Sequence, residues 1–182
     1  MKNILVPLAN GFEEIEAITI IDILRRAGAL VTTAGLIKKN VIGSHHVKIL
    51  ADTVLDDVLE NDWDMIVLPG GIPGAPTLAQ DNRIIKLIKE SEAKRRYTAA
   101  ICAAPTVLER AGVTEGKRVT SHPGSENEIK LGLYTSNSVE QDGLMITGQA
   151  AGSAMKFAFK LVEELFGKEK VLEINKGVLA DL

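Results

Sequence analysis

Short, uninterrupted apolar runs separated by helical patterns are the feature that most restricts the fold of this chain. Residues 4–9 form such a run, and residues 65–68 and 97–101 form two more. A continuously apolar strand is typical of a parallel sheet that is covered on both faces. Between the runs, apolar residues recur at helical spacing, as in residues 13–27, which stop at Gly28. This alternation predicts a doubly wound α/β sandwich.

The rest of the chain continues the alternation. We expect strands at residues 4–9, 30–36, 65–68, 97–101 and 118–121, and strands within 138–147 on either side of a turn at Asp142-Gly143. We expect helices at residues 13–27, 55–59, 83–94, 106–111, 126–131, 153–166 and 168–176, and a short hairpin-like excursion at 40–50. No linker, low-complexity tract or internal repeat interrupts the pattern, so residues 1–182 are expected to form one domain.

Composition excludes several classes of protein. Hydrophobic residues make up 46% and charged residues 25%, which indicates a globular chain rather than a disordered one. A net charge of −3 gives no electrostatic footprint for nucleic acid or an anionic membrane. The single cysteine excludes an intramolecular disulfide and fits a reducing compartment. The apolar start is too short for a signal-peptide core and no run has membrane-spanning length, so a cytoplasmic location is expected.

The only cysteine, Cys102, lies in residues 99–105, where a buried strand is expected to turn sharply into a helix. Such a turn needs small neighbours, and Ala100 and Ala104 occupy the glycine positions of the G-x-S-x-G nucleophile elbow. At a helix N-terminus, free backbone N–H groups and the macrodipole favour a thiolate. The pattern predicts a reactive thiol of low pKa. The alternative is a small buried hydrophobe, the commonest role of a lone cysteine.

A second candidate element follows the strand at residues 65–68, which ends in Pro69-Gly70-Gly71. In an open α/β sheet, ligands bind beyond the carboxyl ends of the strands, so this turn and Cys102 are expected at the same edge. The backbone N–H groups of Gly70, Gly71 and Ala103 would then form an oxyanion hole for a reacting carbonyl. The alternatives are a plain turn and a phosphate loop, but no lysine follows these glycines.

Glu16 is a third candidate, because it lies on a helix that is apolar on most of its faces. A helix of this kind is buried between the sheet and something else, such as another subunit, with Ile21 as one candidate for the interface-facing side chain. A carboxyl group in that position is costly unless it is protonated or paired. The alternative is that Glu16, like Glu13 and Glu14, is an ordinary first-turn acid favoured by the helix dipole.

His122 follows the strand expected at residues 118–121, which places it at the edge that carries Cys102. It can orient or deprotonate the thiol, as in Cys-His pairs, or it can be a surface loop residue. His45 and His46 are adjacent and would point to opposite faces of a strand. No cluster with ligand spacing occurs in the sequence, so we expect no metal and no cofactor.

Five segments together resemble the ThiJ/PfpI (DJ-one) superfamily, and within it the protein deglycase branch and its bacterial ThiJ relatives. They are residues 11–17 (GFEEIEA), 68–71 (LPGG), 99–105 (AAICAAP), 119–123 (VTSHP) and 142–147 (DGLMIT). The resemblance implies a flavodoxin-like fold and a homodimer packed through the first helix. It also implies a nucleophilic Cys102, an acid at Glu16 beside the sulfur, and His122 nearby.

Four departures from the family pattern refine this resemblance. Family proteases carry histidine immediately after the cysteine, where this chain has Ala103, and glutamine amidotransferases need glutamate two residues after the histidine, where this chain has Gly124. Neither activity is therefore expected. Residues 149–152 (QAAG) replace a Gly-Pro-Gly segment, and His45-His46 stands where some relatives bring an arginine towards the pocket. These last two changes concern the choice of substrate.

The resemblance implies a cysteine-dependent, glutathione-independent glyoxalase or deglycase that acts on 2-oxoaldehydes and their glycated adducts, with a role in the oxidative-stress response. The alternative is a redox sensor or chaperone that uses oxidation of the same cysteine and turns over little substrate.

Overall fold

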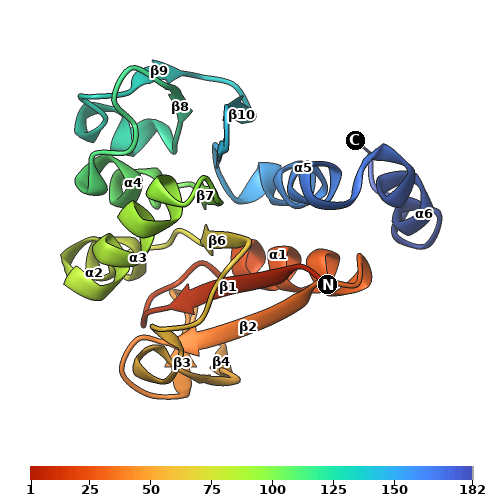
Figure 1. Ribbon diagram of the computed structural model, residues 1–182, viewed down its shortest axis with the longest axis horizontal. Coiled ribbons are helices and arrows are strands. Elements are labelled where there is room, and N and C mark those ends of the chain that lie inside the picture. Colours follow the sequence, from red (N-terminus) through yellow and green to blue (C-terminus); the bar gives the residue numbers. More distant parts are fainter. Residues whose placement is uncertain (182) are drawn as a thin grey trace.

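The computed structural model describes residues 1–181, in which a central seven-stranded sheet lies between two layers of helices (Figure 1). The strand order is β10-β11-β7-β6-β1-β2-β5, and every neighbouring pair is parallel except the antiparallel pair β10–β11. The doubly wound, mostly parallel architecture predicted from the sequence is therefore confirmed.

The sheet strands are β1 (Asn3–Leu8), β2 (Leu30–Gly35), β5 (Thr53–Val54), β6 (Met65–Leu68), β7 (Tyr97–Ile101), β10 (Val139–Asp142) and β11 (Met145–Gly148). Two further pairs lie outside it: the hairpin β3 (Asn40–Ile42) with β4 (Lys48–Leu50), and β8 (Arg118–Thr120) with β9 (Leu133–Thr135). The helices are α1 (Glu14–Arg26), α2 (Gly74–Gln80), α3 (Asn82–Ala93), α4 (Pro105–Ala111), α5 (Ala154–Phe166) and α6 (Lys168–Val178). Short 3-10 helices are η1 (Leu55–Val58), η2 (Pro123–Glu128) and η3 (Ala151–Ser153).

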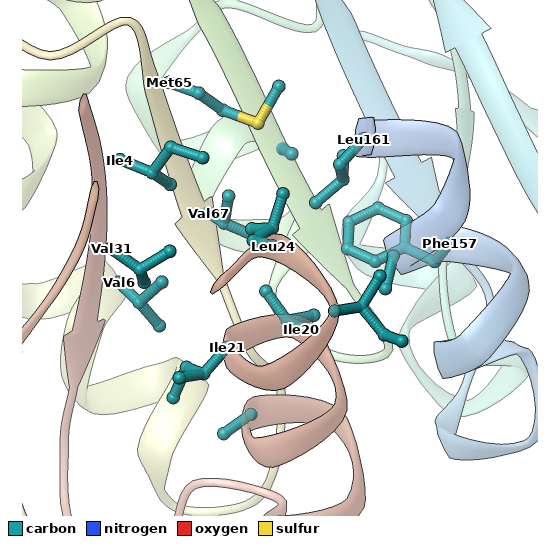
Figure 2. Packing of buried hydrophobic residues seen from close by; sticks show 14 of the residues in the cluster. Ile4, Val6, Ile20, Ile21, Leu24, Val31, Met65, Val67, Phe157 and Leu161 are labelled. Atoms are coloured by element: carbon teal, nitrogen blue, oxygen red, sulfur yellow. The ribbon is translucent and has the colours of Figure 1, made fainter. Parts of the chain in front are cut away.

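The alternation of side chains along each strand divides the core into two halves. Ile4 and Val6 of β1 face α1 and α5, and Figure 2 shows them with Ile20 of α1 and Phe157 of α5. Leu5 points to the opposite face, into the cluster that holds the apolar residues of α2, α3 and α4. Because both faces are covered, the strands need apolar residues at every position, which explains the continuous runs in the sequence.

The structure departs from the expected elements on both sides of β6 and after β8. The sequence pattern did not predict α2, β5 and β9, which are seven, two and three residues long and therefore too short to show a periodic pattern. The helix expected at residues 126–131 is wrong in extent, because the structure has the 3-10 helix η2 at Pro123–Glu128. The Glu109 carboxylate accepts the backbone N–H of Lys130 at 2.8 Å and also that of Leu131. Those N–H groups therefore have partners without a helix.

The parallel pairing brings the carboxyl ends of β1, β6, β7 and β11 to one edge of the sheet. The loops that carry Glu13, Gly70 and Cys102 start there, and Gly148 ends β11 at the same edge. No helix in residues 1–181 is long and apolar enough to cross a membrane.

Candidate active site

Cys102 lies in the tight turn between β7 and α4, and its backbone φ is +65°. This left-handed conformation is uncommon for a residue with a side chain and persists only where the surroundings hold it. Here the Cys102 N–H donates to the Gly148 carbonyl at 2.9 Å, and its own carbonyl accepts the His122 N–H at 2.8 Å. The backbone is held on both sides, and the half-buried side chain lies at the sheet edge. The predicted elbow is present.

Glu16 is fully buried in the first turn of α1. Its Oε2 atom accepts the backbone N–H of Gly70 at 2.8 Å, whereas Oε1 has no hydrogen-bond partner that meets ordinary geometry within residues 1–181. An oxygen left in this way is costly unless it bears or exchanges a proton. Glu16 is therefore no ordinary first-turn acid, because its side chain is turned into the site.

The Glu16 carboxyl and the Cys102 sulfur influence each other's protonation. Burial raises the pKa of Glu16 to about 7, even though contacts with Cys102 and Gly70 act in the opposite direction. Burial and the negative charge of Glu16 raise the pKa of the Cys102 thiol to about 12, while the N–H groups of Ala103 and Gly71 oppose that rise. The expectation of a low-pKa thiol considered the helix N-terminus alone, and it is wrong, because burial and the Glu16 charge outweigh the N–H groups. Once Glu16 holds a proton, its charge no longer opposes the thiolate.

The backbone N–H groups of Gly70 and Gly71, in the turn after β6, have different hydrogen-bond partners. The N–H of Gly70, which was expected to face a reacting carbonyl, donates to Glu16 instead. A Cβ at Gly70 would lie 2.7 Å from the Cβ of Cys102 and 2.8 Å from Oε2 of Glu16, so only glycine fits between the acid and the thiol. The N–H groups of Gly71 and Ala103 are the ones directed at the sulfur.

His122 contacts the site through its backbone N–H, which donates to the Cys102 carbonyl, and not through its ring. The ring is exposed, and its Nδ1 atom accepts the N–H of Gly124 at 3.0 Å. Because a backbone N–H can only donate, Nδ1 is the acceptor and the hydrogen of a neutral ring is on Nε2. Such a ring has no free nitrogen with which to take a proton from Cys102. The geometry thus favours Glu16 over His122 as the proton carrier.

The hairpin β3–β4 is attached to the start of α1 by Glu14, a link that the sequence did not reveal. The Glu14 carboxylate accepts the N–H of His45 at 2.7 Å and the Ser44 hydroxyl at 3.1 Å. Burial alone would raise the pKa of Glu14, but these hydrogen bonds lower it to about 2. Glu13, Glu14 and His45 also offer ligand atoms within 4.8 Å of one another. Hydrogen bonds already occupy the Glu14 oxygens, so we interpret this cluster as an ion-pair network.

An α/β sheet with a strained cysteine elbow and a buried acid beside it defines a class of thiol-dependent proteins, and comparison with known proteins identifies the family. A profile of the DJ-1/PfpI family matches residues 2–164. The chain belongs to the DJ-1/PfpI family.

Individual relatives cover nearly the whole chain. The chain is 42% identical to Protein dj-1beta of Drosophila melanogaster over 181 residues, which are 98% of this chain and 97% of that protein. It is 36% identical to the Glutathione-independent glyoxalase DJR-1.2 of Caenorhabditis elegans, over 90% of this chain and 88% of that protein. The crystal structure of Drosophila melanogaster DJ-1beta matches with a TM-score of 0.97 at 43% identity, covering 100% of this chain and 99% of that one.

Proposed function

We propose that this protein is a glutathione-independent glyoxalase with deglycase-like activity, which converts 2-oxoaldehydes and their early adducts into 2-hydroxy acids at Cys102. The observation that carries the proposal is the fully buried Glu16, whose Oε1 atom lies beside a cysteine elbow and has no hydrogen-bond partner in the described part of the chain. A carboxyl group with a pKa raised to about 7 exchanges protons readily near neutral pH, as a general acid–base must. The C. elegans relative named as a glyoxalase supports the same chemistry.

The reaction starts with attack of the Cys102 sulfur on the aldehyde carbon, while the ionised Glu16 carboxylate takes the proton of the thiol. A C–S bond forms, and the carbonyl oxygen takes a proton from Glu16 to give a hemithioacetal. The N–H groups of Gly71 and Ala103 stabilise the charge that develops on this oxygen. Glu16, now ionised, removes the hydrogen of the former aldehyde carbon as a proton and returns it to the neighbouring carbonyl carbon. The hydroxyl proton of the hemithioacetal passes to the oxygen of that neighbouring carbon, which leaves a thioester of a 2-hydroxy acid.

Water then cleaves the thioester and restores the Cys102 thiol. For methylglyoxal the sum of these steps is methylglyoxal plus water to lactic acid. One carbon is oxidised while its neighbour is reduced, so the sequence balances without an external oxidant or reductant and without glutathione.

The test of this function is lactate formation from methylglyoxal in the absence of glutathione. We expect the wild-type protein to produce lactate and Cys102→Ser to reduce the rate to that of the uncatalysed solution, because the hydroxyl is a far weaker nucleophile. Circular dichroism of both proteins shows whether the variant is folded. Equal lactate formation by the two proteins, or none by the wild type, would contradict the proposal.

Redox sensing remains the second candidate, and the donors around the sulfur favour it. Two equivalents of peroxide convert a thiolate to a sulfinate and release two waters. The N–H groups of Gly71 and Ala103 and a protonated Glu16 would hydrogen-bond the sulfinate oxygens. If the wild type forms no lactate but gains two oxygen atoms at Cys102 under mild peroxide, as seen by mass spectrometry, the sensor function replaces the glyoxalase.

We infer that two copies of the chain pair through the first helix. Ile15 and Ile18 lie three residues apart on α1 and are 58% and 45% exposed, which leaves an apolar strip on the helix. Ile21, the earlier candidate for the interface, is only 8% exposed and packs in the core, so that assignment is wrong.

Ile18→Asp is expected to convert the wild-type dimer to a monomer at micromolar concentration, because pairing would bury an unpaired charge. Sedimentation velocity measures the change. Ile37→Asp, on an isoleucine that is 82% exposed and lies outside α1, is the control and should stay dimeric. A wild type that sediments as a monomer would refute the pairing.

A further inference from the structure

A groove of about 450 Å³ lies between α2, α4 and η2, next to the turn that carries Cys102. Ala103, the residue that follows the cysteine, is among the residues that line the groove, as is Ile72. The N–H of Ala103 is directed at the sulfur, so one residue of the groove lining also contacts the reacting thiol. Its volume lies in the range of small-molecule sites, about 300–1,000 Å³.

One face of α4 forms a wall of the groove. Thr106 and Arg110 both line it, and their spacing of four residues places them on the same side of the helix. With a rise of 1.5 Å per residue, the stretch from Ala103 to Arg110 covers about 10 Å. The wall therefore leads from the thiol to a guanidinium about two helical turns away.

Arg110 is free to take an anionic ligand. Within residues 1–181 its guanidinium makes no ion pair and no hydrogen bond. The adjacent Glu109 does not neutralise it, because the Glu109 oxygens accept the Thr114 hydroxyl and the backbone N–H groups of Lys130 and Leu131. Glu128 also lines the groove, but it lies beyond ion-pair distance of Arg110.

A planar guanidinium with free donors binds a carboxylate through two parallel hydrogen bonds. Methylglyoxal is too short to reach it from Cys102. The geometry points to a carbonyl substrate or adduct that carries a carboxylate about 10 Å from its reacting carbon, held in this groove with the carboxylate on Arg110. This inference rests on the proposed function for the reaction at Cys102, but the binding itself requires only the groove and the thiol.

Alkylation of Cys102 tests the groove without any need for turnover. The probes are N-chloroacetyl-aminohexanoate, whose carboxylate lies about 10 Å from the reactive carbon, and its uncharged carboxamide. The thiolate displaces chloride from both, and mass spectrometry follows the rates. We expect the wild type to react about 5–10-fold faster with the carboxylate, the size of effect expected for one partly exposed charged pair.

Arg110→Gln is expected to bring the ratio of the two rates to about 1, and Arg110→Lys to an intermediate value, since lysine keeps the charge but not the paired donors. Lys89→Gln, which removes an exposed positive charge outside the groove, should keep the wild-type ratio. A ratio near 1 in the wild type, or an equal loss in Arg110→Gln and Lys89→Gln, overturns the inference. A selective ratio in a protein that forms no lactate supports the groove and contradicts only the proposed function.

Discussion

Glu16→Gln is expected to lower lactate formation from methylglyoxal by about 10²–10⁴-fold, the usual cost of losing a general acid–base. Glutamine has nearly the same volume and can still accept the N–H of Gly70 through its carbonyl oxygen. It cannot pass a proton between the two carbons of the substrate. The loss should therefore appear in kcat, measured by lactate formation at saturating methylglyoxal.

The reactivity of the thiol should change in the opposite direction. Removal of the Glu16 charge abolishes one of the causes that raise the pKa of Cys102, so iodoacetamide alkylation should begin at lower pH in the variant. Slower turnover together with easier alkylation would indicate that the variant has lost a proton carrier. A damaged fold would instead lower both the rate of turnover and the rate of alkylation. Glu13→Gln removes a carboxylate from the same end of α1 and should keep turnover near the wild-type rate. Unchanged turnover in Glu16→Gln would remove Glu16 from the mechanism.

The sheet could be predicted from the sequence because its strands are buried on both faces. Residues 65–68 and 97–101 are apolar at almost every position, so their bounds match β6 and β7. The region between β8 and β10 could not be predicted in this way. There, the Glu109 carboxylate, distant in sequence, accepts backbone N–H groups of the segment between η2 and β9, and β9 pairs with β8. Neither these hydrogen bonds nor the strand pairing can be inferred from the local sequence pattern.

In the candidate site, too, local features could be predicted from the sequence and long-range contacts could not. Small residues around Cys102 and the turn at Gly70 and Gly71 are local signals, and they placed the thiol and its glycines at one sheet edge. The roles of Gly70 and His122 depend on which partner each hydrogen-bonding group meets. The sequence could not show that Gly70 holds Glu16 or that the His122 ring is turned to Gly124. Burial also decides the protonation of Glu16 and Cys102, and burial is a property of the folded chain.

The buried Glu16 should make the wild type lose stability relative to Glu16→Gln as the pH rises. The folded-state pKa of about 7 lies above the ordinary value of 4.5, so the folded protein binds the proton more tightly than the unfolded chain. The stability that this proton provides is fully present below pH 4.5 and is lost as the pH rises to about 7. A shift of this size corresponds to about 3 kcal/mol.

Urea denaturation of both proteins at pH 4 and pH 8, at equal protomer concentration, measures this difference. We expect the free energy of unfolding of the wild type to fall by about 3 kcal/mol relative to Glu16→Gln between the two pH values. Groups such as Glu14 and His45 titrate in both proteins, so their contributions cancel in the comparison. A constant difference between the two proteins would mean that Glu16 is ionised at its ordinary pKa, and the proton transfer assigned to it would lose its physical basis.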